Sequence, residues 1–189
     1  WPTEFQEIAS VLREGLGELA KRIDHIGSTS VPGLAAKDII DIQITVATLD
    51  DQDDGVMSAM NALGYRHPEG IWRDHVPPGF VGPDTHWQKY FFRPPHGQRP
   101  TNTHVRVHGR ANQRYPLLFR DYLRAHPATA QAYADGFAKA TGIVAAGLAD
   151  KVKATKGSKV LDLCCGHGVV AAELFARGAS LTGLDFSEA

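Results

Sequence analysis

A short run of alternating residues, 39–46, constrains the fold more than any other part of the chain. Its aliphatic residues recur at every second position, so they share one side of an extended strand. They are Ile40, Ile42, Ile44 and Val46. Asp41 and Gln43 lie on the opposite side of the same strand. The chain therefore contains a sheet with one aliphatic face, and Asp41 points away from that face.

Strand and helix patterns alternate around this run. Strands are predicted over residues 22–27 and 39–46 and, as a hairpin that extends the sheet, over 86–93 and 102–108. A first helix is predicted from Thr3, because Thr3 and Gln6 form a capping box. Further helices are predicted over residues 53–63, over 115–125 and after Pro127. Beyond a polar linker at 151–158, the chain has a strand pattern at 159–163, a helix pattern at 169–177 and a strand pattern at 181–184. This last order is a βαβ unit, whose two strands run parallel.

The composition excludes several classes of function. With 20 Lys and Arg against 21 Asp and Glu, the net charge of −1 gives no field that recruits nucleic acid or an anionic membrane. No apolar run approaches the ~20 residues that a membrane-spanning helix needs. The two cysteines are adjacent, at Cys164 and Cys165, which excludes a disulfide framework and suits a reducing compartment. We expect a soluble, cytoplasmic protein that binds neither nucleic acid nor a membrane.

The residues between the first two predicted strands point to phosphate binding. A Gly-Ser pair that leaves a strand brings backbone N–H groups and a hydroxyl close to a phosphate, and a carboxylate on the next strand can hold a metal ion against that phosphate. Asp41 is the candidate for this carboxylate, as the catalytic residue and as a ligand of Mg²⁺. The candidate phosphate- or nucleotide-binding residues are His25, Gly27, Ser28, Thr29, Ser30, Lys37, His104 and Arg106. The expected partner is a nucleotide or another small phosphorylated molecule.

Three interpretations of these residues stay open. Two-metal nucleotidyl transfer uses two carboxylates two residues apart on one strand. Here the second position is Gln43, which supplies no charge, so such transfer needs Asp38, Asp74 or Asp84 to reach the site. This pattern is compatible with weak nucleotidyl transfer that increases on Gln43→Asp. It is also compatible with ligand binding without transfer, and with a polar turn that binds no ligand. His104 and Arg106 share a strand face and either contact a phosphate near the Gly-Ser turn or lie in solvent. His25 either orients a phosphate or Asp41, or is a buried core histidine.

Three segments carry a resemblance to a known family. The sequences HIGSTSVPGLAAKDIIDI at 25–42, THVRV at 103–107 and FRDYLRAHPATAQAYA at 119–134 resemble the GrpB family. The resemblance covers about residues 1–135. It implies a first domain with an α/β (α+β) fold of the nucleotidyltransferase type, a small mixed sheet backed by helices. It implies no settled activity, although members of the family are sometimes fused to dephospho-CoA kinase.

The C-terminal segment resembles a different family. From Lys159, the sequence KVLDLCCGHGVVAAELFARGASLTGLDFSEA is similar to the start of class I S-adenosylmethionine-dependent methyltransferases. This implies a second domain over residues 136–189, with a truncated Rossmann-like βαβ unit. The cofactor-binding residues that it implies are Asp162, Gly166, Gly168 and Asp185. Two strands do not complete such a domain, so S-adenosylmethionine is a cofactor only if the domain is completed.

The incomplete unit leads to an expectation about assembly. Its strands are apolar through both faces, so we expect them to pack on the first domain or on a second copy of the chain, as a homo-oligomer. Three readings of the whole chain remain. They are a phosphate-binding domain with a methyltransferase-type fragment, an incomplete methyltransferase with an accessory domain, and a folding or interaction accessory without a ligand.

Overall fold

The computed structural model describes residues 1–184 apart from 50–54, 78, 152, 154 and 164–168. The chain divides into two compact units, Trp1–Pro127 and Ala128–Ala189, which are described separately. The helices of the first unit are α1 (Pro2–Leu16), α2 (Gly55–Ala62) and α3 (Ala111–Ala125). Its strands are β1 (Arg22–Ile26), β2 (Ile40–Val46), β3 (Tyr90–Phe92) and β4 (Thr101–Val107). Short 3₁₀ turns lie at Gly17–Leu19, Ser28–Ser30 and Asp84–Trp87.

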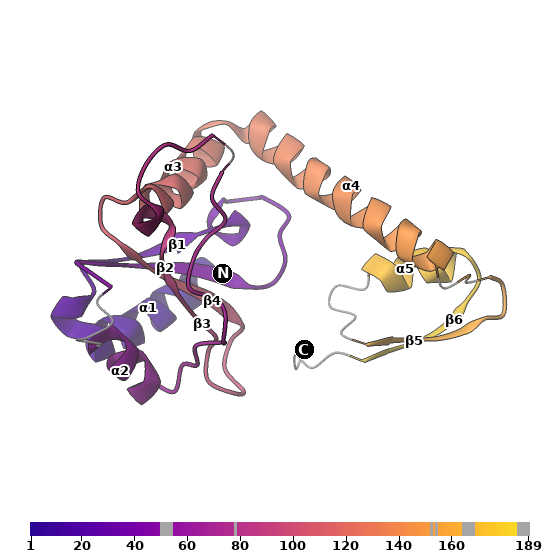
Figure 1. The fold of residues 1–189 in the computed structure, drawn as a ribbon. Helices are drawn as coiled ribbons and strands as arrows, with labels where there is room; N and C mark the ends of the chain where they lie inside the picture. Colours follow the sequence, from indigo (N-terminus) through magenta and orange to yellow (C-terminus); the bar gives the residue numbers. More distant parts are fainter. Residues whose placement is uncertain (50–54, 78, 152, 154, 164–168, 185–189) are drawn as a thin grey trace. The chain divides into compact units, whose positions relative to one another are not determined.

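A four-stranded mixed sheet forms the centre of the first unit (Figure 1). Its strands lie in the order β1-β2-β4-β3, so the predicted hairpin joins the sheet through its second strand. The strand pair β2–β4 is parallel, and the pairs β1–β2 and β3–β4 are antiparallel. The register places Asp41 between Ile26 on β1 and Asn102 on β4. The first unit is therefore a mixed α/β fold with a parallel pair at its centre.

The aliphatic face of β2 builds the core of the first unit. All four of its aliphatic residues are at most 2% exposed. They pack with Phe5, Leu12 and Leu16 of α1 and with Val56 and Met60 of α2. Each such buried side chain stabilises the fold by about 1.5–3 kcal/mol. In Figure 1, α1 and α2 lie on this side of the sheet and α3 lies on the other.

The opposite face of β2 is polar, and it is also buried. Gln43 and Thr45 are fully buried, because α3 covers them. Gln43 Nε2 donates a hydrogen bond to the carbonyl of Gln113 at 2.9 Å, and Gln113 Nε2 donates to Thr45 Oγ1 at 3.4 Å. Buried polar groups need such partners, since an unpaired one costs free energy. Helix α3 is therefore attached to the sheet by hydrogen bonds as well as by packing.

Two helices begin earlier than their sequence patterns predict. Helix α1 starts at Pro2, with Trp1 as the N-cap and no side-chain cap, so the expected capping box of Thr3 and Gln6 is wrong. Proline suits the first helical position because its ring presets φ and its missing N–H would have no helical partner. Helix α3 starts at Ala111, about one turn before its expected start.

The second unit combines a long helix with a pair of parallel strands. Helix α4 (Pro127–Lys151) precedes β5 (Lys159–Leu163), α5 (Val169–Ala176) and β6 (Ser180–Leu184), and β5 pairs with β6 in parallel. Ala149 of α4 packs with Leu174 of α5 and with Ala179 in a small core. Helix α4 therefore packs with the βαβ unit that follows it. The units divide after Pro127, whereas the sequence resemblance sets the boundary after residue 135.

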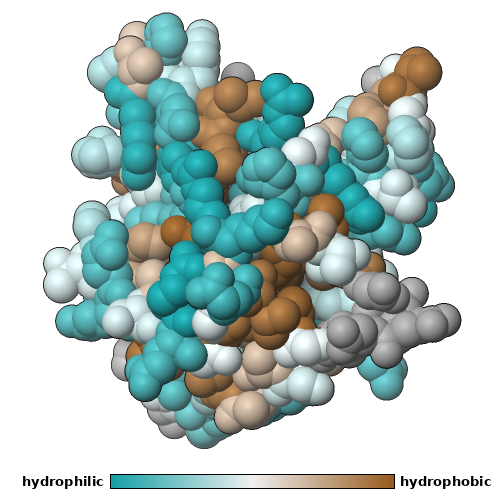
Figure 2. Space-filling view, turned by 90° about the vertical axis from the view of Figure 1, so that its left-hand side faces the viewer, coloured by the Kyte–Doolittle hydropathy of each residue, from teal (hydrophilic) through white to brown (hydrophobic). Residues whose placement is uncertain are grey.

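The surface is mixed in character. Figure 2 shows one face of the molecule, on which hydrophobic surface lies in the centre between hydrophilic residues. Large apolar side chains that are more than half exposed are Val11, Trp72, Val81, Tyr115, Leu118 and Phe175. Isolated apolar residues at the surface are ordinary in soluble proteins. Among the described residues, no helix is both long enough and apolar enough to span a membrane.

Candidate functional site

Asp41 lies in a row of polar residues that crosses the sheet. Asn102 pairs with Asp41 in the parallel register and donates a hydrogen bond from Nδ2 to Asp41 Oδ1 at 2.8 Å. Arg93, which follows β3, donates from Nη1 to Asn102 Oδ1 at 2.6 Å. The exposed Arg93 guanidinium also lies over the ring of Phe91, 4.9 Å from its centroid. The row therefore ends in a positive charge at the surface.

The turn after β1 passes directly over Asp41. Gly27 has a φ of 69°, in the left-handed region that favours glycine. A Cβ on Gly27 would lie 2.9 Å from Asp41 Cγ and would overlap Asp41 Oδ2. Any other residue at this position would therefore displace either the carboxylate or the turn. The fold thus brings the Gly-Ser pair and Asp41 into contact.

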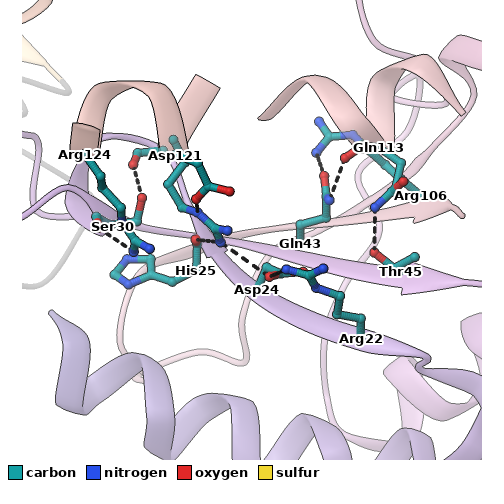
Figure 3. A network of polar contacts seen from close by, with 12 residues as sticks. Arg22, Asp24, His25, Ser30, Gln43, Thr45, Arg106, Gln113, Asp121 and Arg124 are labelled. Atoms are coloured by element: carbon teal, nitrogen blue, oxygen red, sulfur yellow. Dashed lines mark hydrogen bonds and ion pairs between the residues drawn. The ribbon is translucent and has the colours of Figure 1, made fainter. Parts of the chain in front are cut away.

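The turn is held in place by hydrogen bonds. Ser30 Oγ donates to the carbonyl of Gly27 at 2.5 Å. Arg124 of α3 donates from Nε and Nη2 to the Ser30 carbonyl, at 3.0 and 2.8 Å (Figure 3). Thr29 and Ser30 are buried, whereas Ser28 is half-buried. Ser28 is therefore the hydroxyl residue of this turn that a ligand reaches most readily.

A second arginine attaches α3 to the strand that leads into the turn. Arg120 Nη1 donates to the carbonyl of His25 at 3.0 Å and lies 3.3 Å from Asp24 Oδ1. Arg22 Nη2 pairs with the same Asp24 oxygen at 2.6 Å (Figure 3). Helix α3 therefore positions both β1 and the turn beside Asp41.

His25 lies on the aliphatic face of the sheet, away from Asp41. It pairs with Ile42 in the register, and its ring stacks on Phe5 with centroids 4.8 Å apart. Its Nε2 is 3.0 Å from Thr29 Oγ1. Burial, reinforced by the charge of Arg124, lowers the pKa of His25 to about 4, so the ring is neutral at pH 7. The prediction that His25 orients Asp41 is wrong, and the alternative of a core histidine describes its surroundings.

A charged cluster lies beside β3 and β4 on the face of Asp41. Asp74 accepts hydrogen bonds from Lys89 Nζ at 2.6 Å, Arg106 Nε at 2.9 Å and Asn112 Nδ2 at 3.0 Å. Burial alone would raise the pKa of Asp74, but the hydrogen bonds and charges of Arg106 and Lys89 outweigh burial and lower it. His104 Nδ1 lies 3.3 Å from both cations, and burial lowers the pKa of His104 well below its usual value. Two cations therefore share one carboxylate.

His104 and Arg106 were expected either to contact a phosphate near the Gly-Ser turn or to lie in solvent, and Arg106 is in fact buried. Both share the strand face of Asp41, as the two-residue period indicates. Arg106 pairs with Thr45, four residue pairs along the strand from Asp41, and its guanidinium is bound to Asp74. The described partners of the Arg106 guanidinium are therefore Asp74 and Gln43, and a phosphate contact of Arg106 stays a prediction. Lys37, another predicted phosphate ligand, is exposed in the loop before β2.

Gln43 is part of the attachment between the sheet and α3. Its Oε1 accepts a hydrogen bond from Arg106 Nη1 at 2.7 Å. Together with the bond to the Gln113 carbonyl, this contact holds both ends of the amide in the interior. An aspartate at position 43 would face the Arg106 guanidinium. The geometry gives no support to the expectation that Gln43→Asp raises transfer.

Asp41 offers a single carboxylate as a ligand for a cation, which would suit one Mg²⁺ ion rather than two. Burial raises the pKa of Asp41, which the hydrogen bond from Asn102 and the charges of Arg106 and Arg93 oppose. A bound cation would favour the charged carboxylate. Mg²⁺ often uses one or two protein carboxylates and completes its shell with water and phosphate oxygens. In the part of the chain that the structure describes, no group of three His, Cys, Asp or Glu residues comes together.

Three residues of this face were missed from the sequence: Arg93, Asn102 and Lys89. Asp74, considered as a second carboxylate, is paired with Lys89 and Arg106 instead. Asn102 alternates with His104 and Arg106, so the two-residue period was a usable signal for it. Asp74 comes from a loop, and no local pattern shows that this loop returns to β4. These findings do not test the residues that the resemblance implies for binding of S-adenosylmethionine. Gly166, Gly168 and Asp185 lie outside the described residues, and the side chain of Asp162 is not described.

Comparison with known proteins identifies the family. Residues 1–141 match the GrpB protein family. The chain belongs to this family. The resemblance of the first domain to GrpB is thereby confirmed, whereas the comparisons give no support to the methyltransferase resemblance of the C-terminal segment.

Relatives of known structure or sequence span the same region. The crystal structure of the conserved protein GrpB from Enterococcus faecalis is 29% identical, with a TM-score of 0.54 over 80% of this chain and 79% of that one. The UPF0157 protein PA4798 of Pseudomonas aeruginosa is 38% identical over 138 residues, 71% of this chain and 51% of that protein. A dephospho-CoA kinase of Mycobacterium tuberculosis (strain CDC 1551 / Oshkosh) is 39% identical over 145 residues, 70% of this chain but 35% of the kinase. This chain thus spans about a third of the kinase and half of the UPF0157 protein.

Proposed function

We propose that the GrpB unit binds a nucleotide or another small phosphorylated molecule at the Gly27–Ser30 turn, with Mg²⁺ held between Asp41 and the phosphate. The contact between Gly27 and Asp41 carries this proposal. Only glycine allows the backbone to lie against the carboxylate, so a phosphate at the turn and a cation at Asp41 would be immediate neighbours. We also propose that the fold is of the nucleotidyltransferase type.

Each part of the site has a role in this proposal. The backbone N–H groups at the start of the turn and the Ser28 hydroxyl bind phosphate oxygens, while the amides of Ser30 and Val31 stay bonded to the carbonyls of Gly27 and Ser28. Bound Mg²⁺ supplies positive charge that the phosphate needs and that Asp41 alone lacks. Arg93 adds a planar donor at the exposed end of the row, which its stacking on Phe91 and its bond to Asn102 keep in place.

The geometry favours binding over efficient nucleotidyl transfer. Two-metal transfer needs a second carboxylate beside Asp41. The residue two positions along the same strand face is Gln43, which is fully buried and bonded to Arg106. We therefore expect slow transfer or none.

Isothermal titration calorimetry tests the proposal on the full chain. ATP, CTP and coenzyme A precursors are titrated with Mg²⁺ and again with EDTA. We expect binding that requires Mg²⁺ and that weakens at least about tenfold in Asp41→Ala, because the metal then loses its protein ligand. Glu14→Ala is the control, since Glu14 is an exposed carboxylate of the same unit.

Two results would contradict the proposal. Binding that is unchanged by EDTA and by Asp41→Ala would remove the metal from the site. Rapid Mg²⁺-dependent release of pyrophosphate from ATP or CTP by the unmodified chain would show that transfer does not need a second carboxylate.

A second candidate function concerns the C-terminal unit. Its parallel strands on either side of a helix support a proposal that this unit derives from a nucleotide- or S-adenosylmethionine-binding fold. Titration with S-adenosylmethionine tests this function separately from the Asp41 site. A chain that binds none of these compounds would favour the reading as a folding or interaction accessory.

A further inference from the structure

A cavity of about 550 Å³ lies in the first unit, apart from the Gly27 turn. Its buried lining residues are Lys89 and Tyr90, at the start of β3, and its exposed ones include Trp72 and Arg73. Lys89 lies beside Arg106, four residue pairs along and two strands across from Asp41, which corresponds to about 16 Å in a sheet. The volume falls within the range of small-molecule sites. The cavity is therefore a separate place from the proposed phosphate site.

One wall of the cavity is a half-exposed aromatic ring in a fixed position. Trp72 is 51% exposed. Its ring packs against His67, with centroids 4.1 Å apart, and meets Tyr90 at 5.8 Å and nearly perpendicular, at 81°. Leu49 adds an aliphatic surface to the lining. A ring held on one side and open on the other is suited to stacking with a planar ligand.

The charges beside the cavity favour an anion. Lys89 is only 8% exposed, and it shares the carboxylate of Asp74 with Arg106. Since His104 is neutral, this buried group carries one positive charge in excess. At the rim, Arg73 and Asp84 lie 3.9 Å apart and offset each other. An uncompensated buried charge is costly, so an anion in the cavity would stabilise the group.

Backbone hydrogen bonds hold the two walls together. The amide of Lys89 donates to the carbonyl of Trp72 at 3.0 Å, and the amide of Asp74 donates to the carbonyl of Trp87 at 2.7 Å. These bonds join the segment around Trp72 to the residues that precede β3. The stacking ring and the buried ammonium are therefore positioned before any ligand arrives, which lowers the entropic cost of binding.

We propose that this cavity binds a small planar aromatic molecule that carries an anionic group, with the ring on Trp72 and the anion directed toward Lys89. The two features act together, because neither an uncharged ring nor an inorganic anion would satisfy both walls. The anionic group is a carboxylate or a phosphate, which present similar oxygens to a cation.

Matched ligand pairs test the proposal by calorimetry and by quenching of tryptophan fluorescence. Nicotinate is compared with nicotinamide and phenyl phosphate with phenol, so that each pair differs mainly in charge, and inorganic phosphate supplies an anion without a ring. We expect nicotinate or phenyl phosphate to bind at least tenfold more tightly than its uncharged partner, with affinity that falls as salt rises. The anion that binds more tightly shows whether the anionic group of the ligand is a carboxylate or a phosphate.

Three variants separate this site from the proposed function. Trp72→Leu is expected to weaken binding of the aromatic anion at least tenfold, whereas Tyr115→Leu, which removes an exposed ring from α3, should leave it unchanged. Asp41→Ala should also leave it unchanged, since the cavity does not include Asp41. Thermal unfolding checks that each variant is folded. Equal affinity for charged and uncharged partners, no binding of either anion, or binding that Trp72→Leu does not weaken would overturn the proposal.

Discussion

Burial of His25 links the stability of the first unit to pH. The pKa of His25 is lowered from 6.5 to about 4, first by burial and then by the charge of Arg124. Between these two values the unfolded chain binds a proton that the folded chain does not. The stabilisation by neutral His25 is therefore complete above pH 6.5 and is lost as pH falls toward 4. Its full extent is at most about 3 kcal/mol.

Removal of the imidazole should flatten this part of the stability curve. In His25→Gln, the amide can still reach Thr29 but does not titrate, so the free energy of unfolding should change less between pH 6.5 and 4 than in the parent chain. Urea unfolding at a series of pH values measures the difference. His126→Gln is the control, since His126 is exposed. An unchanged slope in His25→Gln would mean that His25 takes up a proton without unfolding.

The same residues show what a strand pattern can and cannot predict. The two-residue period placed Asp41 opposite the aliphatic residues of β2 correctly, because alternation is a property of one strand. The same period puts His25 on the side of Ile23, yet its closeness to Gly27 in the sequence favoured a role beside Asp41. The bond from Asn102 to Asp41 depends on the parallel register of β2 and β4, which no single strand reveals.

At the scale of elements, α3 determines the shape of the candidate site. Arg124 holds the turn through the Ser30 carbonyl, and Arg120 holds β1 through the His25 carbonyl (Figure 3). The sequence predicted a helix here but not its first turn, which contributes Asn112 and Gln113 to the polar face. Helix propensity locates a helix but not the partners of its side chains, since those partners come from distant strands and loops.

Arg124→Lys should loosen the turn without unfolding α3. Lysine cannot make the paired contact of a guanidinium with the Ser30 carbonyl, so about 1–2 kcal/mol of local stabilisation should be lost. The amides of Ser30 and Val31, which donate to the carbonyls of Gly27 and Ser28, report this by hydrogen exchange. We expect exchange at these two amides to accelerate about tenfold or more.

A matched change on the same helix controls for loss of a guanidinium. Arg114 is exposed on α3, so Arg114→Lys should leave exchange in the turn unchanged. Equal exchange at Ser30 and Val31 in both variants would show that the turn keeps its shape without Arg124.

At the scale of the whole chain, the two units differ in how much core the structure describes. The first has a cluster of fifteen buried residues from two helices, three strands and the segments beside them, with its own polar network on the other face of the sheet. In the second, the described core consists of Ala149, Leu174 and Ala179, with Val160 packed against it. The GrpB match reaches residue 141, so it includes the first unit and part of α4. Folding of the first unit should therefore depend little on the second.

A chain that ends at Pro127 should fold, bind phosphate compounds as the full chain does, and be monomeric. The full chain should instead self-associate, because β5 pairs only with β6 among the described residues and a two-stranded sheet is marginal alone. Strand edges of this kind pair readily with a second copy. Light scattering at micromolar concentration measures both masses, and thermal unfolding compares the stability of the first unit. A chain of residues 1–141 tests whether the start of α4 matters. A monomeric full chain would rule out pairing between copies, and failure of residues 1–127 to fold would show that the second unit supports the first.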